Sequence, residues 1–146
     1  MLRVLTVFVL ISNVAFAADD YRLRLESARC QVADAVYQAN ELPTYTPLPA
    51  YEYFRSLAIE IAHEAEYDIE AAEMWANTAD GWWKEYSKLM VMRATNQYVN
   101  PTTLAKVKSY YDTSVKNCNE KLDLAFMNAK SSLVQTSICK MYESGK

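Results

Sequence analysis

Apolar side chains recur at alternating steps of four and three residues between about residues 50 and 99 of the chain. This spacing keeps side chains on one face of a helix that packs against another helix. The expected inward row comprises Phe54, Ala58, Ile61, Ala65, Asp68, Ala72, Trp75, Ala79, Trp82, Tyr86 and Leu89. Gly81 costs about 1 kcal/mol relative to alanine inside a helix, so the pattern leaves open whether this segment continues, bends or breaks there.

A second helical segment is predicted before it, over about residues 20–41. One apolar row on this segment comprises Leu25, Ala28, Val32, Ala35, Ala39 and Leu42. Another row, nearly opposite and at steps of seven, comprises Leu23, Cys30 and Tyr37. A helix that is apolar on two sides is usually flanked by two partners or covered by an additional segment.

Three prolines separate these two segments, in the sequence LPTYTPLP at residues 42–49. Proline lacks an N–H group and disfavours helical geometry in the residue before it, so an extended connection is expected. Tyr45 and Leu48 of this connection are expected to lie along the surface of the bundle. The alternative is a proline-rich ligand for a partner domain.

The last helix is predicted from Pro101 to about residue 143, with Asn100 as its N-terminal cap. Its apolar row comprises Leu104, Tyr111, Val115, Cys118, Leu122, Ala125, Ala129, Thr136 and Cys139. Because only a tight turn precedes it, this helix is expected to fold back antiparallel on the central one. The chain is therefore predicted to be all-α, an elongated antiparallel bundle of three helices, or of four if Gly81 breaks the middle one.

Composition agrees with this fold class and narrows the function. A chain of 146 residues is long enough for one domain with a modest core, and it holds only two glycines and four prolines. The formal net charge of -3 gives no electrostatic reason to expect nucleic-acid binding. The sequence contains one histidine, no Cys-x-x-Cys, no glycine-rich phosphate loop and no Gly-x-Ser-x-Gly elbow, so an enzyme is not expected.

The first 17 residues have the pattern of a signal peptide. Arg3 provides a positive start, residues 4–11 are mostly apolar, and Ala15-Phe16-Ala17 is the small-x-small site that a signal peptidase cleaves. Cleavage after Ala17 would leave residues 18–146 as one domain, exported to a bacterial periplasm or secreted. An N-terminal anchor or an ordinary core helix is the alternative, and no later segment has the length and apolarity of a membrane span.

Exported proteins tend to oxidise their thiols, and the mature chain would contain Cys30, Cys118 and Cys139. Folding the helices back with equal rise per residue places Cys30 beside about residue 62 and Cys139 beside about residue 60 of the central helix. Cys118 falls beside about residue 81, roughly 30 Å away. This predicts a disulfide between Cys30 and Cys139 that ties the bundle, with Cys118 buried as a small apolar residue. A reactive thiol or an intermolecular disulfide at Cys118 is the alternative.

Six acidic residues lie within residues 60–73, with no lysine or arginine among them. They are Glu60, Glu64, Glu66, Asp68, Glu70 and Glu73. Either the lysines of the last helix neutralise this acidic face within the bundle, or the face docks a basic partner or binds Ca²⁺ weakly. Asp68 falls on the inward row and needs a partner if it is buried, for which Tyr111 or a lysine of the last helix is available.

Glu60 and His63 form a Glu-x-x-His step, the unit with which carboxylate bundles hold iron. Both side chains are expected to project away from the core, whereas a metal site needs ligands that converge inside the bundle. No metal or cofactor is therefore expected. A metal- or haem-binding bundle that uses Glu60 and His63 stays open as an alternative.

Aromatic residues gather near the turn between the last two helices, where the adjacent Trp82 and Trp83 cannot both point fully inward. This aromatic end is either plain core or a binding hot spot, for which a partly exposed tryptophan is typical. The leader, the acidic face and the aromatic end together predict an exported protein that binds another protein, such as an inhibitor or immunity-type protein for a basic exported enzyme. A structural subunit of a self-associating exported assembly is a further alternative.

Overall fold

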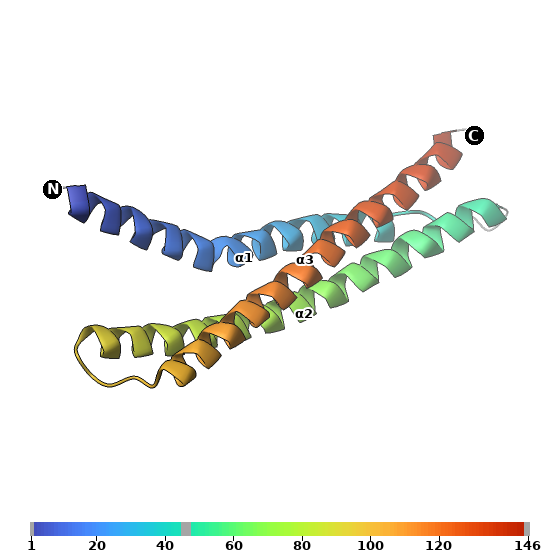
Figure 1. Ribbon diagram of the computed structural model, residues 1–146. Coiled ribbons are helices and arrows are strands. Elements are labelled where there is room, and N and C mark those ends of the chain that lie inside the picture. Colours follow the sequence, from blue (N-terminus) through green and yellow to red (C-terminus); the bar gives the residue numbers. More distant parts are fainter. Residues whose placement is uncertain (1, 45–47, 145–146) are drawn as a thin grey trace.

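Three helices make up the computed structural model, which describes residues 2–44 and 48–144, with side chains from residue 20 onward. They are α1 (Leu2–Asn40), α2 (Pro49–Ala94) and α3 (Pro101–Ser144), and the described residues contain no strand. Figure 1 shows α2 and α3 side by side and antiparallel along their length, with α1 on one side of this pair. The predicted all-α class and the antiparallel return of the last helix are confirmed, in three helices.

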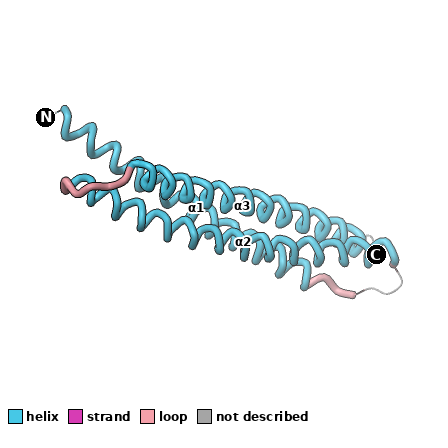
Figure 2. The backbone as a smooth tube through the Cα atoms, turned by 60° about the horizontal axis from the view of Figure 1, so that its bottom comes forward, coloured by secondary structure: helices cyan, strands magenta, loops and turns pink. Residues whose placement is uncertain are grey.

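The ends of the long helices follow from local sequence. Pro49 and Pro101 each open a helix, where a missing N–H group costs nothing. Asn100 caps α3 as predicted, because its Oδ1 accepts a hydrogen bond from the N–H of Thr102 at 2.9 Å. In the turn between the helices, Asn96 adopts a positive φ of 61°, a conformation that asparagine tolerates better than most residues. Figure 2 shows how short this turn is relative to the pair it joins.

The central helix runs through Gly81 without a break. Gly81 lies on the exposed side of α2 with an ordinary helical φ. A Cβ atom added there would have no heavy atom within 4 Å, so no close approach requires the glycine. The question left open by the sequence is thus answered in favour of one continuous helix.

Small residues form the seam between α2 and α3. The buried residues of α2 are Tyr51, Ala58, Ala62, Ala65, Ala72, Ala76 and Ala79. Those of α3 are Val107, Ser114, Cys118, Leu122, Ala125, Ala129, Ser132, Thr136 and Cys139. The hydroxyl of Ser132 donates to the backbone carbonyl of Ala58 at 2.8 Å, so a side chain of α3 touches the backbone of α2. Side chains this small let the two helices approach closely.

The expected inward row of α2 is right at every seventh residue and wrong between those positions. Ala58, Ala65, Ala72 and Ala79 are fully buried as predicted. The larger members of the row are half-buried instead: Phe54, Ile61, Asp68, Trp75, Trp82, Tyr86 and Leu89. The seam is completed by Ala62 and Ala76, each one residue after a large member of the expected row. The large side chains therefore lie on the flanks of the seam.

The predicted inward row of α1 is confirmed, since all six of its members, from Leu25 to Leu42, are buried. The second row is not covered by any described segment. Leu23 is 61% exposed, Tyr37 is 66% exposed, and Cys30 between them is exposed as well. The expectation that α1 is covered on two sides is therefore wrong for the part of the chain that the structure describes.

The segment between α1 and α2 runs back along the first turns of α2. Leu42 is buried, and its carbonyl accepts a hydrogen bond from Nε of Arg55 at 3.4 Å. The hydroxyl of Tyr51 donates to the carbonyl of Pro43 at 2.5 Å. Because of this return path, α1 ends beside the interior of α2 and not beside its start. Residues 45–47, which include Tyr45 of the predicted extended connection, lie outside the described residues.

The predicted disulfide between Cys30 and Cys139 is wrong, because all three thiols are free. Cys30 follows Arg29, which pairs with Glu73 of α2. Cys139 is buried on α3, where its Sγ donates to the carbonyl of Tyr51 at 3.7 Å. These two levels are about 20 residues of α2 apart, roughly 30 Å, whereas a disulfide joins Cα atoms less than about 7 Å apart.

Candidate protein-interaction site between α1 and α2

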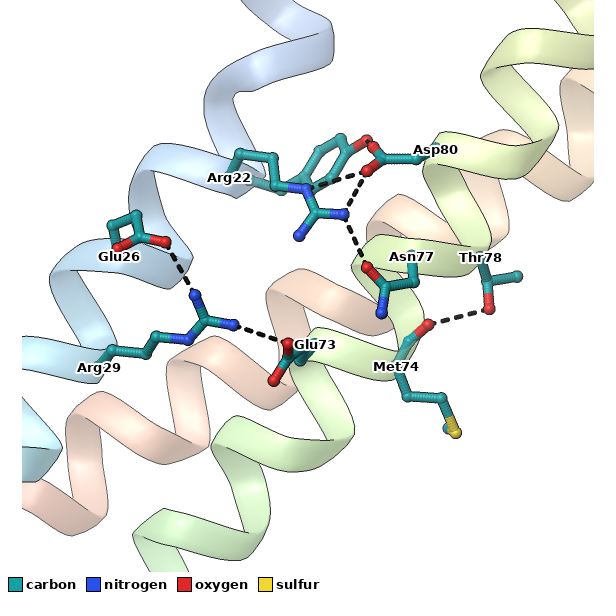
Figure 3. Close-up of polar contacts among 9 residues, drawn as sticks. Arg22, Glu26, Arg29, Glu73, Met74, Asn77, Thr78 and Asp80 are labelled. Atoms are coloured by element: carbon teal, nitrogen blue, oxygen red, sulfur yellow. Dashed lines mark hydrogen bonds and ion pairs between the residues drawn. The ribbon is translucent and has the colours of Figure 1, made fainter.

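A cluster of polar contacts fastens α1 to α2 near Asp80 (Figure 3). The guanidinium of Arg22 donates to Oδ2 of Asp80 through Nε at 3.1 Å and also through Nη2. The hydroxyl of Tyr21 donates to the other carboxylate oxygen, and Arg22 reaches Oδ1 of Asn77 at 2.9 Å. The hydrogen bond to Asp80 raises the pKa of Arg22, and burial followed by the same carboxylate raises the pKa of Tyr21.

Arg29, two turns further along α1, makes a second polar contact between α1 and α2. Its guanidinium pairs with Glu26 on the same helix at 2.8 Å and with Glu73 on α2 at 3.0 Å. Figure 3 shows Arg29 pointing from α1 toward α2 between these two carboxylates. Glu73, which was predicted to belong to an open acidic face, is therefore engaged inside the molecule.

A groove begins at Arg29 and runs between α1 and α2 toward the end of α1, with a volume of about 580 Å³. Its lining residues are Arg29, Val32, Ala33, Val36, Tyr37, Asn40 and Glu41 of the α1 side and Glu66, Ile69 and Glu70 of α2. Val32 is buried and Val36 and Ile69 are half-buried, so they form an apolar floor. Tyr37 stands at the lip of the groove, largely exposed.

Carboxylates border this floor on both sides. Glu66 and Glu70 lie one helical turn apart on α2, and Glu41 lies on the α1 side. Among the side chains that the structure describes, Glu41 and Glu70 take part in no ion pair. The one cation of the lining, Arg29, is already bonded to two carboxylates. The groove is thus apolar at its floor and negatively charged at its rim.

The predicted acidic face divides into parts with different surroundings. Glu66 and Glu70 border the groove, Glu73 pairs with Arg29, and Glu60 and Glu64 are exposed on α2 outside the groove. Among the described side chains, no lysine of α3 forms an ion pair with these glutamates. The arginine that pairs with this face comes from α1 and reaches only Glu73, at one end, while His63 of α2 lies beside Glu66.

Asp68 and His63 have partners other than those considered from the sequence. Asp68 is half-buried, and one of its oxygens accepts a hydrogen bond from Nδ2 of Asn128 on α3 at 2.8 Å. His63 is exposed, with Nδ1 3.0 Å from Oε1 of Glu66. Within the described residues, no group of three or more histidine, cysteine or acidic side chains is arranged to hold a metal ion.

The aromatic end contains two tilted pairs of rings that join α2 to α3. The rings of Trp82 and Tyr110 lie 4.9 Å apart, and those of Trp83 and Tyr111 lie 5.1 Å apart. Trp82 and Trp83 are both half-buried, so the two adjacent tryptophans share the inward direction between them. Tyr110 remains 48% exposed, which leaves an aromatic surface at this end of the molecule.

The buried thiols are held in their neutral form. Burial raises the pKa of Cys118, which lies in the apolar cluster around Leu25 and Leu122. Burial and the nearby carboxylate of Glu143 raise the pKa of Cys139. A thiol that stays protonated is a poor nucleophile, so neither side chain is suited to covalent chemistry.

Sequence reasoning did not single out Val36, Tyr37, Glu41 or Ile69 as site residues. Their local patterns were visible, because Val36 adjoins the buried row of α1 and Ile69 lies between Glu66 and Glu70. The sequence did not show that these residues line one groove, because this depends on which residues of α2 lie beside the end of α1. The path of the segment that connects α1 to α2 determines that position.

Comparison with protein-family models, with curated proteins and with solved structures found no match to this chain. Among the described residues, no helix combines the length and the apolarity that crossing a membrane requires.

Proposed function

We propose that this protein is an exported helical binding protein that holds a basic segment of another protein in the groove between α1 and α2. One observation carries the proposal: an apolar floor of Val32, Val36 and Ile69 is bordered by three carboxylates, none of which pairs with a lysine or arginine among the described side chains. Apolar contact supplies affinity, and a matched charge pattern supplies orientation and rapid association. An inhibitor or immunity-type protein for a basic exported enzyme is the specific form of this function.

The predicted signal peptide supports export and is compatible with the site. The backbone of residues 2–19 is helical within α1, and the side chains of residues 1–19 lie outside the description. Cleavage after Ala17 would remove none of the groove, whose first lining residue is Arg29. It would also leave Tyr21 and Arg22 in place to bind Asp80.

The experiment is a capture from the exported fraction of the source organism, with the full chain expressed there and tagged at its C-terminus. We expect a basic protein to be recovered with the intact chain and to be lost with the double variant Glu66→Lys, Glu70→Lys. The matched control is Glu60→Lys, Glu64→Lys, which places the same charges at the same spacing on α2 outside the groove.

Circular dichroism of both double variants checks that the fold is unchanged. Equal capture by all three proteins, or loss of the partner with the control pair alone, contradicts the groove as the binding site. The mass of the recovered chain tests cleavage after Ala17 in the same preparation.

A further inference from the structure

We infer that the segment bound in the groove is an amphipathic helix of about three turns, apolar toward the floor and carrying lysine or arginine on its flanks. The inference rests on the proposed function and adds the conformation, length and polarity of the bound segment. Three properties of the groove carry it: the direction and length of its walls, the state of their backbone groups, and the position of the rim carboxylates.

The walls of the groove are two helices that run along each other. On α1 the lining residues Arg29, Ala33, Val36 and Asn40 follow steps of four, three and four, which is a continuous ridge of a helix. From Arg29 to Asn40 the ridge is about 17 Å long, the rise of roughly three helical turns. A helix bound along this ridge packs against α1 and α2 as a fourth helix of the bundle, at the shallow crossing angle common in helix bundles.

The backbone of the walls favours a helix over an extended segment. α2 runs without interruption past the groove, and α1 lines it as far as its own last residue, Asn40. Up to the last turn of α1, the N–H and C=O groups of both walls are therefore bonded within their own helices. An extended segment takes its affinity from main-chain hydrogen bonds to an exposed sheet edge, which the described chain does not have. A bound helix satisfies its own backbone and presents only side chains to the floor.

The carboxylates specify the charge of the bound helix. Glu66 and Glu70 are spaced by four residues on one bank, so cations one turn apart on the bound helix meet both. Glu41 attracts a further cation near the end of α1. At the other end the groove stops at the Arg29–Glu73 ion pair, which limits the length of the bound segment. Tyr37 at the lip is the aromatic anchor expected of such a contact.

The test uses two synthetic peptides of about 14 residues, the length of four helical turns, built from the same numbers of Leu, Ala and Lys. In one, leucine recurs at steps of three and four; in the other, leucine and lysine alternate. Fluorescence anisotropy measures the binding of each labelled peptide to the intact chain. We expect the helical peptide to bind about tenfold more tightly or better, and its circular dichroism to become helical on binding.

Two double variants separate the groove from general charge. Glu66→Gln with Glu70→Gln is expected to weaken binding of the helical peptide by about tenfold. Glu60→Gln with Glu64→Gln, which removes the same charge outside the groove, is expected to leave binding unchanged. Val36→Asp removes apolar floor and is expected to weaken binding as well. Because Val36 also packs against two buried clusters of the bundle, the circular dichroism of this variant must match that of the intact chain.

The remaining outcomes overturn the inference in distinguishable ways. If both peptides bind equally and the Glu66/Glu70 variant binds neither, the groove accepts basic segments of any conformation. That result overturns the bound helix but agrees with the proposed function. Failure of both peptides to bind overturns the helix and the groove together. A chain that self-associates, and dissociates with the Glu66/Glu70 variant, identifies a second copy as the occupant and overturns the basic partner helix.

Discussion

Arg22 on α1 binds the carboxylate of Asp80 on α2 through two of its N–H groups, and this contact determines where α1 lies along the long pair. Tyr21 binds the second oxygen of the same carboxylate. One turn earlier on α2, Oδ1 of Asn77 accepts a hydrogen bond from the same guanidinium. With the Arg29–Glu73 pair, these contacts align the apolar floor with the acidic segment and so define the groove.

Replacement of Asp80 by asparagine should loosen this attachment. The change removes a charge-assisted contact in which both side chains are partly exposed, so we expect a loss of about 1–2 kcal/mol in the free energy of unfolding. Urea unfolding followed by circular dichroism measures it. Glu64→Gln, an exposed carboxylate on the same helix, is the control and should change the free energy by less than about 0.5 kcal/mol. Equal effects of the two variants would contradict a specific role for Asp80.

Replacement of Ala65 by leucine should force α2 and α3 apart. Ala65 is fully buried in the seam, and added methylene groups in a tightly packed core cost typically about 1–3 kcal/mol. We expect the upper part of this range, because Ser132 touches the α2 backbone two turns away and fixes a short separation. The melting temperature and the urea midpoint report the loss. Ser56→Leu, on the exposed side of α2, should leave both nearly unchanged.

The three thiols should react at very different rates. Cys30 is exposed, whereas Cys118 and Cys139 are buried with raised pKa values. With an aromatic disulfide reagent at pH 8, we expect one thiol per chain to react quickly and the other two about 100-fold more slowly. Cys30→Ser should remove the fast phase alone. A native chain with fewer than three thiols after denaturation without reductant would contradict the free cysteines.

Alkaline pH should destabilise the fold. Burial is the main cause that raises the pKa of Tyr21 and of Tyr51, followed by the hydrogen bonds to Asp80 and to Glu143. Both tyrosines therefore ionise more readily in the unfolded chain, at a pKa of about 10. Their contribution is fully present below that pKa and is lost as the pH rises above it.

Urea unfolding at about pH 8, 10 and 11 measures this dependence across the ordinary pKa of tyrosine. We expect the free energy of unfolding to fall over the upper interval. Tyr21→Phe should reduce the slope of the fall, whereas Tyr67→Phe, at a 70% exposed position, should not. A stability that is flat up to pH 11 would contradict the raised pKa values.

The fold class and the inward face of α1 were predictable because the longer of two apolar rows specified them. The inward row has six members, in which Leu25 and Val32 alternate with alanines, whereas the opposite row of Leu23, Cys30 and Tyr37 has three. Asn100 and Pro101 likewise specify the start of α3, because cap chemistry is local. Features that depend on nearby residues alone were therefore predicted correctly.

The exact seam of α2 was harder to predict because size and hydrophobicity favour different positions. Ile61 and Trp75 are more apolar than Ala62 and Ala76, so a hydrophobic pattern places them inside. Close contact between two backbones instead selects the alanines, and the larger side chains cover the flanks. The observed seam differs from the expected row by a shift of one residue at these positions, and this shift decides which side chains of α2 are buried.

The disulfide and the groove could not be predicted because both depend on how far α1 is shifted along the pair of α2 and α3. Equal rise per residue placed Cys30 about 10 residues too close to the start of α2, because it ignored the return path held by Tyr51 and Arg55. The same displacement brings Val36 beside Ile69 and the acidic segment. Sequence pattern carries no information on that path, so the acidic residues were predicted without the apolar floor between the helices.

Burial along α2 ends at Ala79, and this gives the molecule a gradient of local opening. From Asp80 to Ala94 every described residue is half-buried or exposed, and contacts between tilted aromatic rings, such as Trp83 with Tyr111, join the helices there. Backbone amides at this end should exchange with deuterium far sooner than those of the alanine seam. The aromatic end can therefore open and reclose while the groove stays assembled, and a protein that bound the tryptophans would reveal itself by slowing exchange there alone.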